Sequence, residues 1–194
     1  MEKIDLKLPD SEIIYFPKFY DSETASKMFE TLLKETSWQQ DDIKVFGKTY
    51  KQPRLTALYA ENEKPYSYSN LTMHPKPFSP LLKEIKKDLE AISGKEFTTV
   101  LLNLYRDGND SNGWHSDDEK ELGNNPAIAS LSLGAERMFH LNHKTIPNLK
   151  TKMALNHGSL LLMQGPTQHF WKHQLAKTAR KVGPRINLTF RLIK

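Results

Sequence analysis

The chain has 194 residues, which suffices for one domain with a substantial hydrophobic core and is rather short for two. It contains no cysteine, which excludes disulfides, thiolate metal sites and thiol nucleophiles, so any metal must be held by His, Asp or Glu. The net charge of +5 permits contacts with nucleic-acid phosphates without requiring them.

The sequence gives no sign of membrane targeting or of internal division. The N-terminal stretch MEKIDLKLPDSEIIYF lacks the apolar core of a signal peptide, and no apolar run approaches membrane-spanning length. Internal repeats, low-complexity runs and Gly/Ser linkers are absent as well. We therefore expect one domain over residues 1–194 and a monomer without a membrane partner, located in the cytoplasm or, in a eukaryote, in the nucleus.

Two amphipathic helices are predicted in the first half of the chain. The first follows DSETASKMFETLLKE, where Ser22 is the expected N-cap and apolar residues recur at helical spacing. The second begins near Pro80 and ends around Ser93 and Gly94, where a glycine suits the C-terminal cap.

From residue 97 onward the pattern changes to short strands separated by Gly, Pro and Asn. The predicted strands are FTTVLLNLY, AIASLSLG, RMFHL, GSLLLM, HFWKH and RINLTFRLI. Many short strands without intervening helices indicate a sandwich, jelly roll or barrel. We therefore predict an α+β fold with an antiparallel β core over residues 96–194, buttressed by helices from residues 1–95.

The stretch GWHSDDE carries the first candidate for metal chemistry. It places His115 and Asp117 two residues apart, so on a strand both side chains would share one face. Taken alone, so short a pattern is more often a polar surface cluster. A two-His-one-carboxylate Fe(II) site needs one more imidazole, and His169 and His173 of HFWKHQL both qualify on a predicted strand. The remaining histidines in this half are expected at the surface, in or beside turns: His140, His143 and His157.

The C-terminal stretch PRINLTFRLI suggests a pocket for an anion. Read at period 2, one face is apolar, whereas the other carries Arg185, Asn187 and Arg191, which recognise carboxylates or phosphates well. Asn103 and Tyr105 share one face of LLNLY, just before the turn that leads to the His-x-Asp pair. If these strands line one barrel, the set suits a small dicarboxylate that chelates the metal.

These residues together resemble the AlkB family of Fe(II)- and 2-oxoglutarate-dependent dioxygenases. The similarity rests on His115-x-Asp117, a later His and the motif RINLTFR, and it extends to NLYRDGNDSNGWHSDDE, AIASLSLGAER, HGSLLLM and VFGK…PR at residues 45–54. Among the members of this family, the sequence is most similar to those that repair alkylated duplex DNA. The resemblance implies a double-stranded β-helix (jelly-roll) core, with Fe(II), 2-oxoglutarate and O₂ as cofactor and co-substrates.

The implied activity is oxidative demethylation of N-alkylated bases in DNA, such as 1-methyladenine and 3-methylcytosine. In that reaction decarboxylation of 2-oxoglutarate is coupled to hydroxylation of the methyl group, and formaldehyde is released. The protein would supply positioning and exclusion of water.

The resemblance also implies roles for individual residues. The implied iron ligands are His115, Asp117 and His173, which selects His173 over His169. The implied 2-oxoglutarate pocket consists of Asn103, Tyr105, Arg185, Asn187 and Arg191. Within it Arg185 and Tyr105 are expected at the distal carboxylate, and Arg191 nearer the metal and Asp117.

Recognition of a base requires a flipped nucleotide, stacking surfaces and polar groups for the base edge. By resemblance, Tyr68 stacks on the damaged base, Phe46 and Gly47 form a wedge that enters the base stack, and acidic residues after the metal motif approach the base. The implied substrate contacts are Phe46, Gly47, Lys48, Arg54, Tyr66, Tyr68, Asp118 and Glu119. Further candidate phosphate contacts are Lys172, Lys177, Arg180 and Lys181.

Two other interpretations remain open at this point. The same chemistry could act on RNA or on a modified protein, or the chain could be a metal-holding barrel that binds nucleic acid without catalysis. The second is disfavoured by the complete ligand set and both arginines, which a non-catalytic descendant need not keep.

Overall fold

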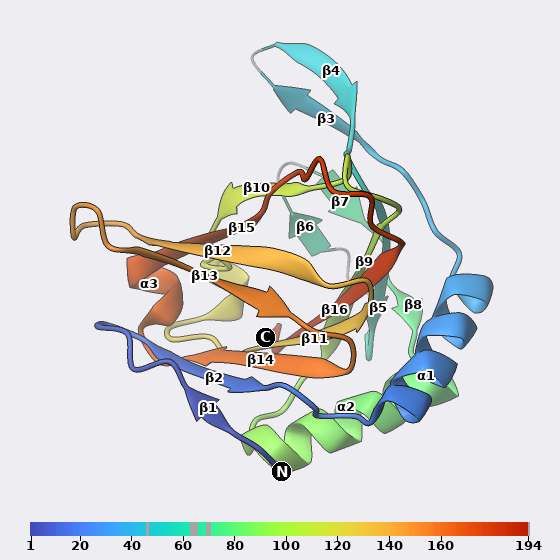
Figure 1. Ribbon diagram of the computed structural model, residues 1–194. Helices are drawn as coiled ribbons and strands as arrows, with labels where there is room; N and C mark the ends of the chain where they lie inside the picture. The colour runs from blue at the N-terminus through green and yellow to red at the C-terminus, as the bar shows by residue number, and fades with distance from the viewer. Residues whose placement is uncertain (46, 63–65, 69–70, 194) are drawn as a thin grey trace.

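The computed structural model describes residues 1–45, 47–62, 66–68 and 71–193 and consists of two facing β-sheets with helices along one side (Figure 1). The larger sheet has the order β1 (Ile4–Asp5), β2 (Glu12–Phe16), β14 (Ser159–Gln164), β11 (Ile128–Gly134), β16 (Arg185–Arg191), β9 (Thr99–Tyr105), β5 (Leu55–Ala60) and β8 (Lys76–Pro77). The smaller sheet has the order β10 (Asn112–His115), β15 (Trp171–Leu175), β12 (Arg137–His143) and β13 (Lys150–Leu155). The predicted α+β fold with a jelly-roll core is confirmed.

Two short hairpins and four helical segments complete the described part of the chain. The hairpins are β3 (Asp42–Val45) with β4 (Lys48–Lys51), and β6 (Tyr66–Tyr68) with β7 (Leu71–Met73). The helices are α1 (Ser22–Glu35), α2 (Pro80–Ser93), α3 (Thr167–Phe170) and a 3₁₀ helix (Lys120–Leu122). None of the described helices is long and apolar enough to cross a membrane.

Capping residues define the ends of α1 and α2, the two helices predicted from the sequence. Asp21, and not Ser22, is the N-cap of α1, because its carboxylate accepts the backbone N–H of Thr24 at 2.8 Å. Helix α2 begins with Pro80 and ends at Gly94, which adopts a left-handed φ of 63°. The apolar stripes of both helices pack into one cluster with the larger sheet, so the helices buttress that sheet as predicted.

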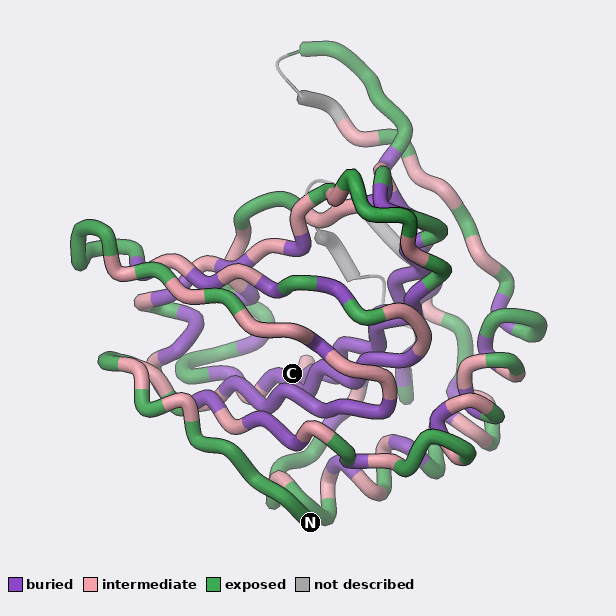
Figure 2. Tube along the Cα trace, in the orientation of Figure 1, coloured by how far each residue is buried: buried purple, intermediate pink, exposed green. Residues whose placement is uncertain are grey.

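Strand β16 lies in the middle of the larger sheet and separates the helices from the interior between the sheets. Its apolar residues Ile186, Leu188 and Phe190 belong to the cluster that includes the helices. All seven of its residues are buried (Figure 2), so its polar side chains face the second sheet and not solvent. The polar face therefore lines an interior pocket.

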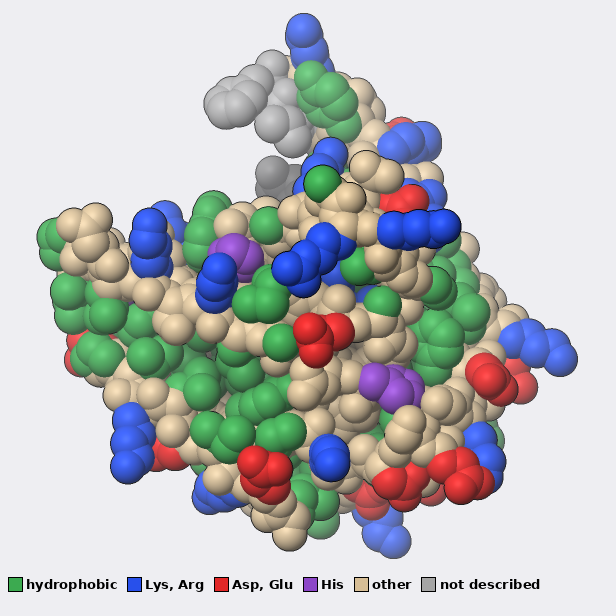
Figure 3. Space-filling view, in the orientation of Figure 1, with side chains coloured by type: hydrophobic (Ala, Val, Ile, Leu, Met, Phe, Trp, Pro, Cys, Tyr) green, Lys and Arg blue, Asp and Glu red, His purple; other side chains and the backbone are tan. Residues whose placement is uncertain are grey.

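The smaller sheet has an inner face and a solvent-exposed outer face. Inward residues such as Leu141 and Trp171 join a second apolar cluster between the sheets. The outer face is polar and carries several lysines, which lie toward the viewer in Figure 3.

Two predictions about histidines were wrong. The segment HFWKH is not one strand: the chain turns at Gly165, α3 covers the first part, and β15 begins only at Trp171, so the exposed His169 shares no strand face with His173. His143 is buried and not at the surface, because its Nδ1 accepts the backbone N–H of Ile146 at 2.9 Å.

Candidate active site

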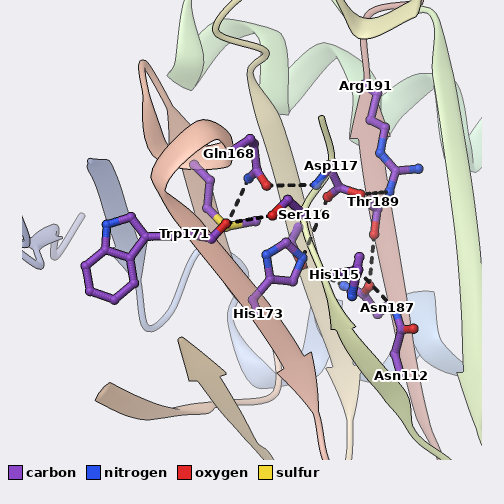
Figure 4. A network of polar contacts seen from close by, with 12 residues as sticks. Asn112, His115, Ser116, Asp117, Gln168, Trp171, His173, Asn187, Thr189 and Arg191 are labelled. Atoms are coloured by element: carbon purple, nitrogen blue, oxygen red, sulfur yellow. Dashed lines mark hydrogen bonds and ion pairs between the residues drawn. The ribbon is translucent and has the colours of Figure 1, made fainter. Parts of the chain in front are cut away.

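Two side chains from neighbouring strands and one from the segment after β10 converge on one point between the sheets. Ligand atoms of His115, Asp117 and His173 all lie within 4.8 Å of one another, a spacing that can hold a metal ion. His115 ends β10 and is paired directly with His173 of β15, whereas Asp117 lies two residues beyond β10 (Figure 4). The cluster thus arises from cross-strand pairing, and not from the strand alternation expected from the sequence.

The protonation states of this cluster suit a divalent transition metal. Burial lowers the pKa of both His115 and His173, the latter to about 3, so both imidazoles are neutral and able to ligate. Burial alone would raise the pKa of Asp117, but the Arg191 guanidinium beside it lowers the pKa to about 2. The Nδ1 of His115 donates to the Gly113 carbonyl at 2.8 Å, which leaves Nε2 as the ligand atom.

Arg191 holds the carboxylate of Asp117 in place. Its Nη2 donates to Oδ1 of Asp117 at 2.6 Å, and both side chains are almost fully buried. This arrangement agrees with the expected position of Arg191 beside Asp117. Two imidazoles and one carboxylate form the donor set typical of non-haem Fe(II) centres that keep open positions, so the residues present fit an iron ion.

Two polar residues that the sequence reasoning missed fix the backbone around Asp117. The side-chain carbonyl of Gln168, which is 1% exposed, accepts the backbone N–H of Asp117 at 2.9 Å. The hydroxyl of Ser116 donates to the carbonyl of Trp171 at 2.9 Å, two residues before His173 (Figure 4). No local pattern marks Gln168, because its partner lies 51 positions away in the chain.

Arg137 is a third residue that the sequence reasoning missed. It is 4% exposed and donates to the carbonyls of Asp107 and Asp110 at 3.0 Å each, and of Ala176 at 2.7 Å. It thereby joins the loop before β10 to the loop after β15. Its guanidinium also lies 6.0 Å from the ring centre of Tyr105.

Arg185 supplies a buried positive charge in the same pocket. It is 2% exposed, its Nη2 donates to the Ser132 hydroxyl at 2.9 Å, and its guanidinium lies 5.4 Å from the ring centre of Tyr105. Its Nε is buried and has no hydrogen-bond partner in the described part of the chain. Burial lowers the pKa of Arg185 to about 10, and no carboxylate among the described residues forms an ion pair with it. A carboxylate of 2-oxoglutarate would form such an ion pair.

The two asparagines expected in the pocket line it as well, each held by a neighbour. Asn187 donates to the Ser130 hydroxyl at 2.7 Å. Asn103 accepts the Nε–H of Arg54 at 2.8 Å. Arg54, which was expected among the substrate contacts, is only 4% exposed and holds the Asn103 side chain through this bond.

The expected substrate contacts are described only in part. Phe46 and the side chains of Tyr66 and Tyr68 lie outside the described residues. Gly47 has a φ of 77° in the turn of the β3–β4 hairpin, where Lys48 is exposed. Directly after the metal motif, Asp118 is paired with Lys144 at 3.0 Å, and Glu119 is half-buried. The structure brings neither acidic residue into the metal cluster.

Comparison with known proteins defines the class of this protein. A sequence profile of the 2OG-Fe(II) oxygenase superfamily matches residues 12–191. The solved structure of OsALKBH1 covers 93% of this chain and 97% of its own, with a TM-score of 0.69 and 17% identity, which shows the shared fold alone. Fold, donor set and profile agree on an Fe(II)- and 2-oxoglutarate-dependent oxygenase.

Curated relatives narrow the class. The alpha-ketoglutarate-dependent dioxygenase alkB homolog 3 of Bos taurus is 43% identical over 197 residues, covering 94% of this chain and 66% of the relative. The DNA oxidative demethylase ALKBH2 is 39% identical in Homo sapiens (87% of this chain, 69% of the relative) and 36% identical in Mus musculus (97% and 86%). The chain therefore belongs to the AlkB family, within the 2OG-Fe(II) oxygenase superfamily, and its His-Asp-His donor set fits the Fe(II) of that superfamily. It spans just under two thirds of the length of the bovine relative.

The position of Gln168 predicts a role in metal binding. Replacing it with Met keeps a side chain of similar length but leaves the N–H of Asp117 without its acceptor, and we expect Fe(II) affinity to fall about 10-fold or more. Anaerobic calorimetric titration of Fe(II) into the variant measures this. Gln174→Met, the same change on the outer side of β15, is the control and should bind like the wild type. Unchanged affinity in a folded Gln168→Met protein would show that the contact is dispensable.

The position of Arg185 predicts a selective effect on 2-oxoglutarate. Truncating one partner of a buried charge pair costs about 2–5 kcal/mol, so Arg185→Ala should weaken 2-oxoglutarate binding by about 30-fold or more. Affinity for an unmodified oligonucleotide should stay the same. Both affinities are measured on the iron-loaded, oxygen-free protein, with Lys83→Ala, an exposed cation on α2, as control. Equal losses for both ligands would point to a structural arginine.

Proposed function

We propose that this chain is an oxidative demethylase of N-alkylated nucleic-acid bases such as 1-methyladenine and 3-methylcytosine, with DNA as the preferred substrate. The observation that carries the proposal is the buried pocket in which a His-Asp-His cluster and the uncompensated Arg185 guanidinium face the same space. The name of the human relative, a DNA oxidative demethylase, supports DNA as the substrate. We further propose one dioxygenase domain over residues 1–194 that acts as a monomer in the cytoplasm or nucleus.

Different side chains of the pocket would bind the iron and the co-substrate. His115, Asp117 and His173 would hold the iron, and Arg185 would orient the distal carboxylate of 2-oxoglutarate. Iron, with 2-oxoglutarate and O₂, supplies the oxidation that places one oxygen atom on the methyl carbon and the other in succinate, with loss of CO₂. The resulting N-hydroxymethyl group breaks its C–N bond, which gives formaldehyde and returns a proton to the base nitrogen.

The chain's own contribution is positioning and exclusion of water. Arg191 keeps the Asp117 carboxylate ionised and turned toward the two imidazoles, while Tyr105 packs beside the Arg185 guanidinium. The pocket lies between the two sheets, so its charged groups act in surroundings of low dielectric constant.

The β3–β4 hairpin supports a preference for duplex DNA. It projects from the body of the protein (Figure 1), and in the sequence Phe46 and Gly47 stand between its paired residues Val45 and Lys48. An apolar side chain at such a tip can fill the gap left by a flipped base and offset part of the unstacking cost of a few kcal/mol. We propose that Phe46 is this wedge and that Tyr68 stacks on the flipped base.

The central test is turnover of a methylated oligonucleotide. With Fe(II) and 2-oxoglutarate, the protein should form succinate and formaldehyde in equal amounts as the base is repaired.

Turnover should be abolished by each of the substitutions His115→Ala, Asp117→Ala and His173→Ala, because two ligands are too few to hold the iron. The circular dichroism spectrum of each variant should stay native. Glu84→Ala, on the exposed side of α2, is the control. Substantial turnover by Asp117→Ala at saturating iron would reject the assignment. Absence of turnover in the wild type would favour a non-catalytic barrel.

The wedge makes a separate prediction about substrate form. Phe46→Ala should slow repair of a methylated duplex markedly more than repair of the same lesion in a single strand, which has little stacking to lose. Tyr50→Ala removes an exposed aromatic ring from the same hairpin, away from its turn, and should leave the ratio of the two rates unchanged. If Phe46→Ala slows both substrates equally, the turn is a structural hairpin and the preference for duplex DNA loses its support.

A further inference from the structure

The outer face of the smaller sheet carries a group of cationic side chains that is separate from the arginines of the pocket. Strand pairing places one set of side chains on this face: Lys172 and Gln174 of β15, Met138, His140 and Asn142 of β12, and Lys150, Lys152 and Ala154 of β13. None of these outward positions is an Asp or Glu. Figure 3 shows basic side chains (Lys or Arg, blue) and a histidine over this sheet.

Trp114 adds an aromatic ring to the same face. Its side chain is 43% exposed, which is unusual for so large an apolar ring, and the Nζ of Lys172 lies 5.7 Å from the ring centre. Beside it a hollow of about 380 Å³ is lined by Trp114, His140, Asn142, Lys150 and Lys152. We call this surface, made of the same five residues and Lys172, the Trp114 face.

The chemistry of the Trp114 face matches an unpaired nucleic-acid strand. Surfaces that bind single strands combine cations that follow the phosphates with aromatic rings on which bases stack. The Asn142 amide and the His140 imidazole can also hydrogen-bond to a base edge. In an intact duplex the faces of the bases are covered by their neighbours, so a ring such as Trp114 reaches a base only where the strand is unpaired. An acidic peptide would satisfy the lysines but would leave the ring without a partner.

The Trp114 face is also continuous with the active site. Trp114 directly precedes His115 on β10, which lies at the end of the strand order in the smaller sheet. His115 lines the pocket on the inner side, and Trp114 points outward. A strand that leaves the pocket across this edge therefore meets Trp114 first and the lysines of β15, β12 and β13 next.

We propose that the Trp114 face binds the unpaired strand that flanks the target nucleotide, with one base stacked on Trp114 and phosphates on Lys150, Lys152 and Lys172. The inference rests on the proposed demethylase function and specifies its substrate: a lesion with an accessible single-stranded flank. The wedge hairpin and this face are compatible, because strands separated at the lesion expose such a flank.

The experiment compares a short methylated oligonucleotide that fills only the pocket with the same oligonucleotide extended on its 5′ or its 3′ side. For the wild type, one of the two extensions should lower KM. Trp114→Ala should raise KM for the extended substrate by about fivefold or more, which is the lower end of what one stacked base contributes. Trp114→Phe should keep KM for this substrate close to the wild-type value. KM for the short substrate and Fe(II) affinity should be unchanged in each variant.

Binding of an unmodified strand, measured by fluorescence anisotropy without turnover, separates stacking from charge. Trp114→Ala should weaken a strand that carries bases and leave an abasic strand unaffected. The double variant Lys150→Ala/Lys152→Ala should weaken both and lower the slope of log K against log salt by about 0.7 for each phosphate that is no longer neutralised. The matched control is Lys83→Ala/Lys87→Ala on α2, two exposed lysines on another part of the molecule.

Three results would overturn the proposal: no benefit from either extension, equal losses for short and extended substrates, or equal loss of abasic and base-bearing strands in Trp114→Ala. An acidic peptide that displaces the strand from the wild type and loses affinity equally in Trp114→Ala would also overturn it, in favour of a protein partner. Because binding is measured without turnover, failure to demethylate any substrate would count against the proposed function alone.

Discussion

The ion pair between Arg191 and Asp117 is the interaction on which the site depends. A carboxylate that is 1% exposed would ordinarily be driven toward its neutral form, and a protonated Asp117 would be a poor metal ligand. The guanidinium at 2.6 Å reverses this tendency, while burial keeps His115 and His173 neutral. The contact also joins the end of β16 to the segment after β10. Removing one partner of such a buried pair costs about 3–5 kcal/mol of folding stability.

Strand β16 also makes the pocket suited to an anion. Arg185 and Arg191 stand at the two ends of β16, and the two-residue period of a strand puts both on its inner face. Arg191 is balanced by the protein's own carboxylate, whereas the buried Arg185 donates to the Ser132 hydroxyl and lies over the Tyr105 ring. A dicarboxylate that reaches from Arg185 to the metal cluster would therefore complete the charge balance of the interior. Membership of the AlkB family agrees with this interpretation.

Sequence reasoning succeeded where the physical signal was local or repeated. The period-2 pattern of β16 indicated the polar interior face, and the apolar stripes indicated α1 and α2. It failed where contacts join distant parts of the chain, because Gln168 and Arg137 left no local trace. The choice of His173 over His169 came only from the family resemblance, because both histidines were expected on the same strand face. In the structure α3 contains His169 and only His173 lies on a strand.

The most direct test of the metal and co-substrate site is anomalous diffraction at the iron edge from crystals grown without oxygen in the presence of Fe(II) and 2-oxoglutarate. We expect one iron peak bounded by His115, Asp117 and His173, with a carboxylate of 2-oxoglutarate paired to the Arg185 guanidinium. Iron bound elsewhere, or a co-substrate carboxylate that does not contact Arg185, would contradict this assignment.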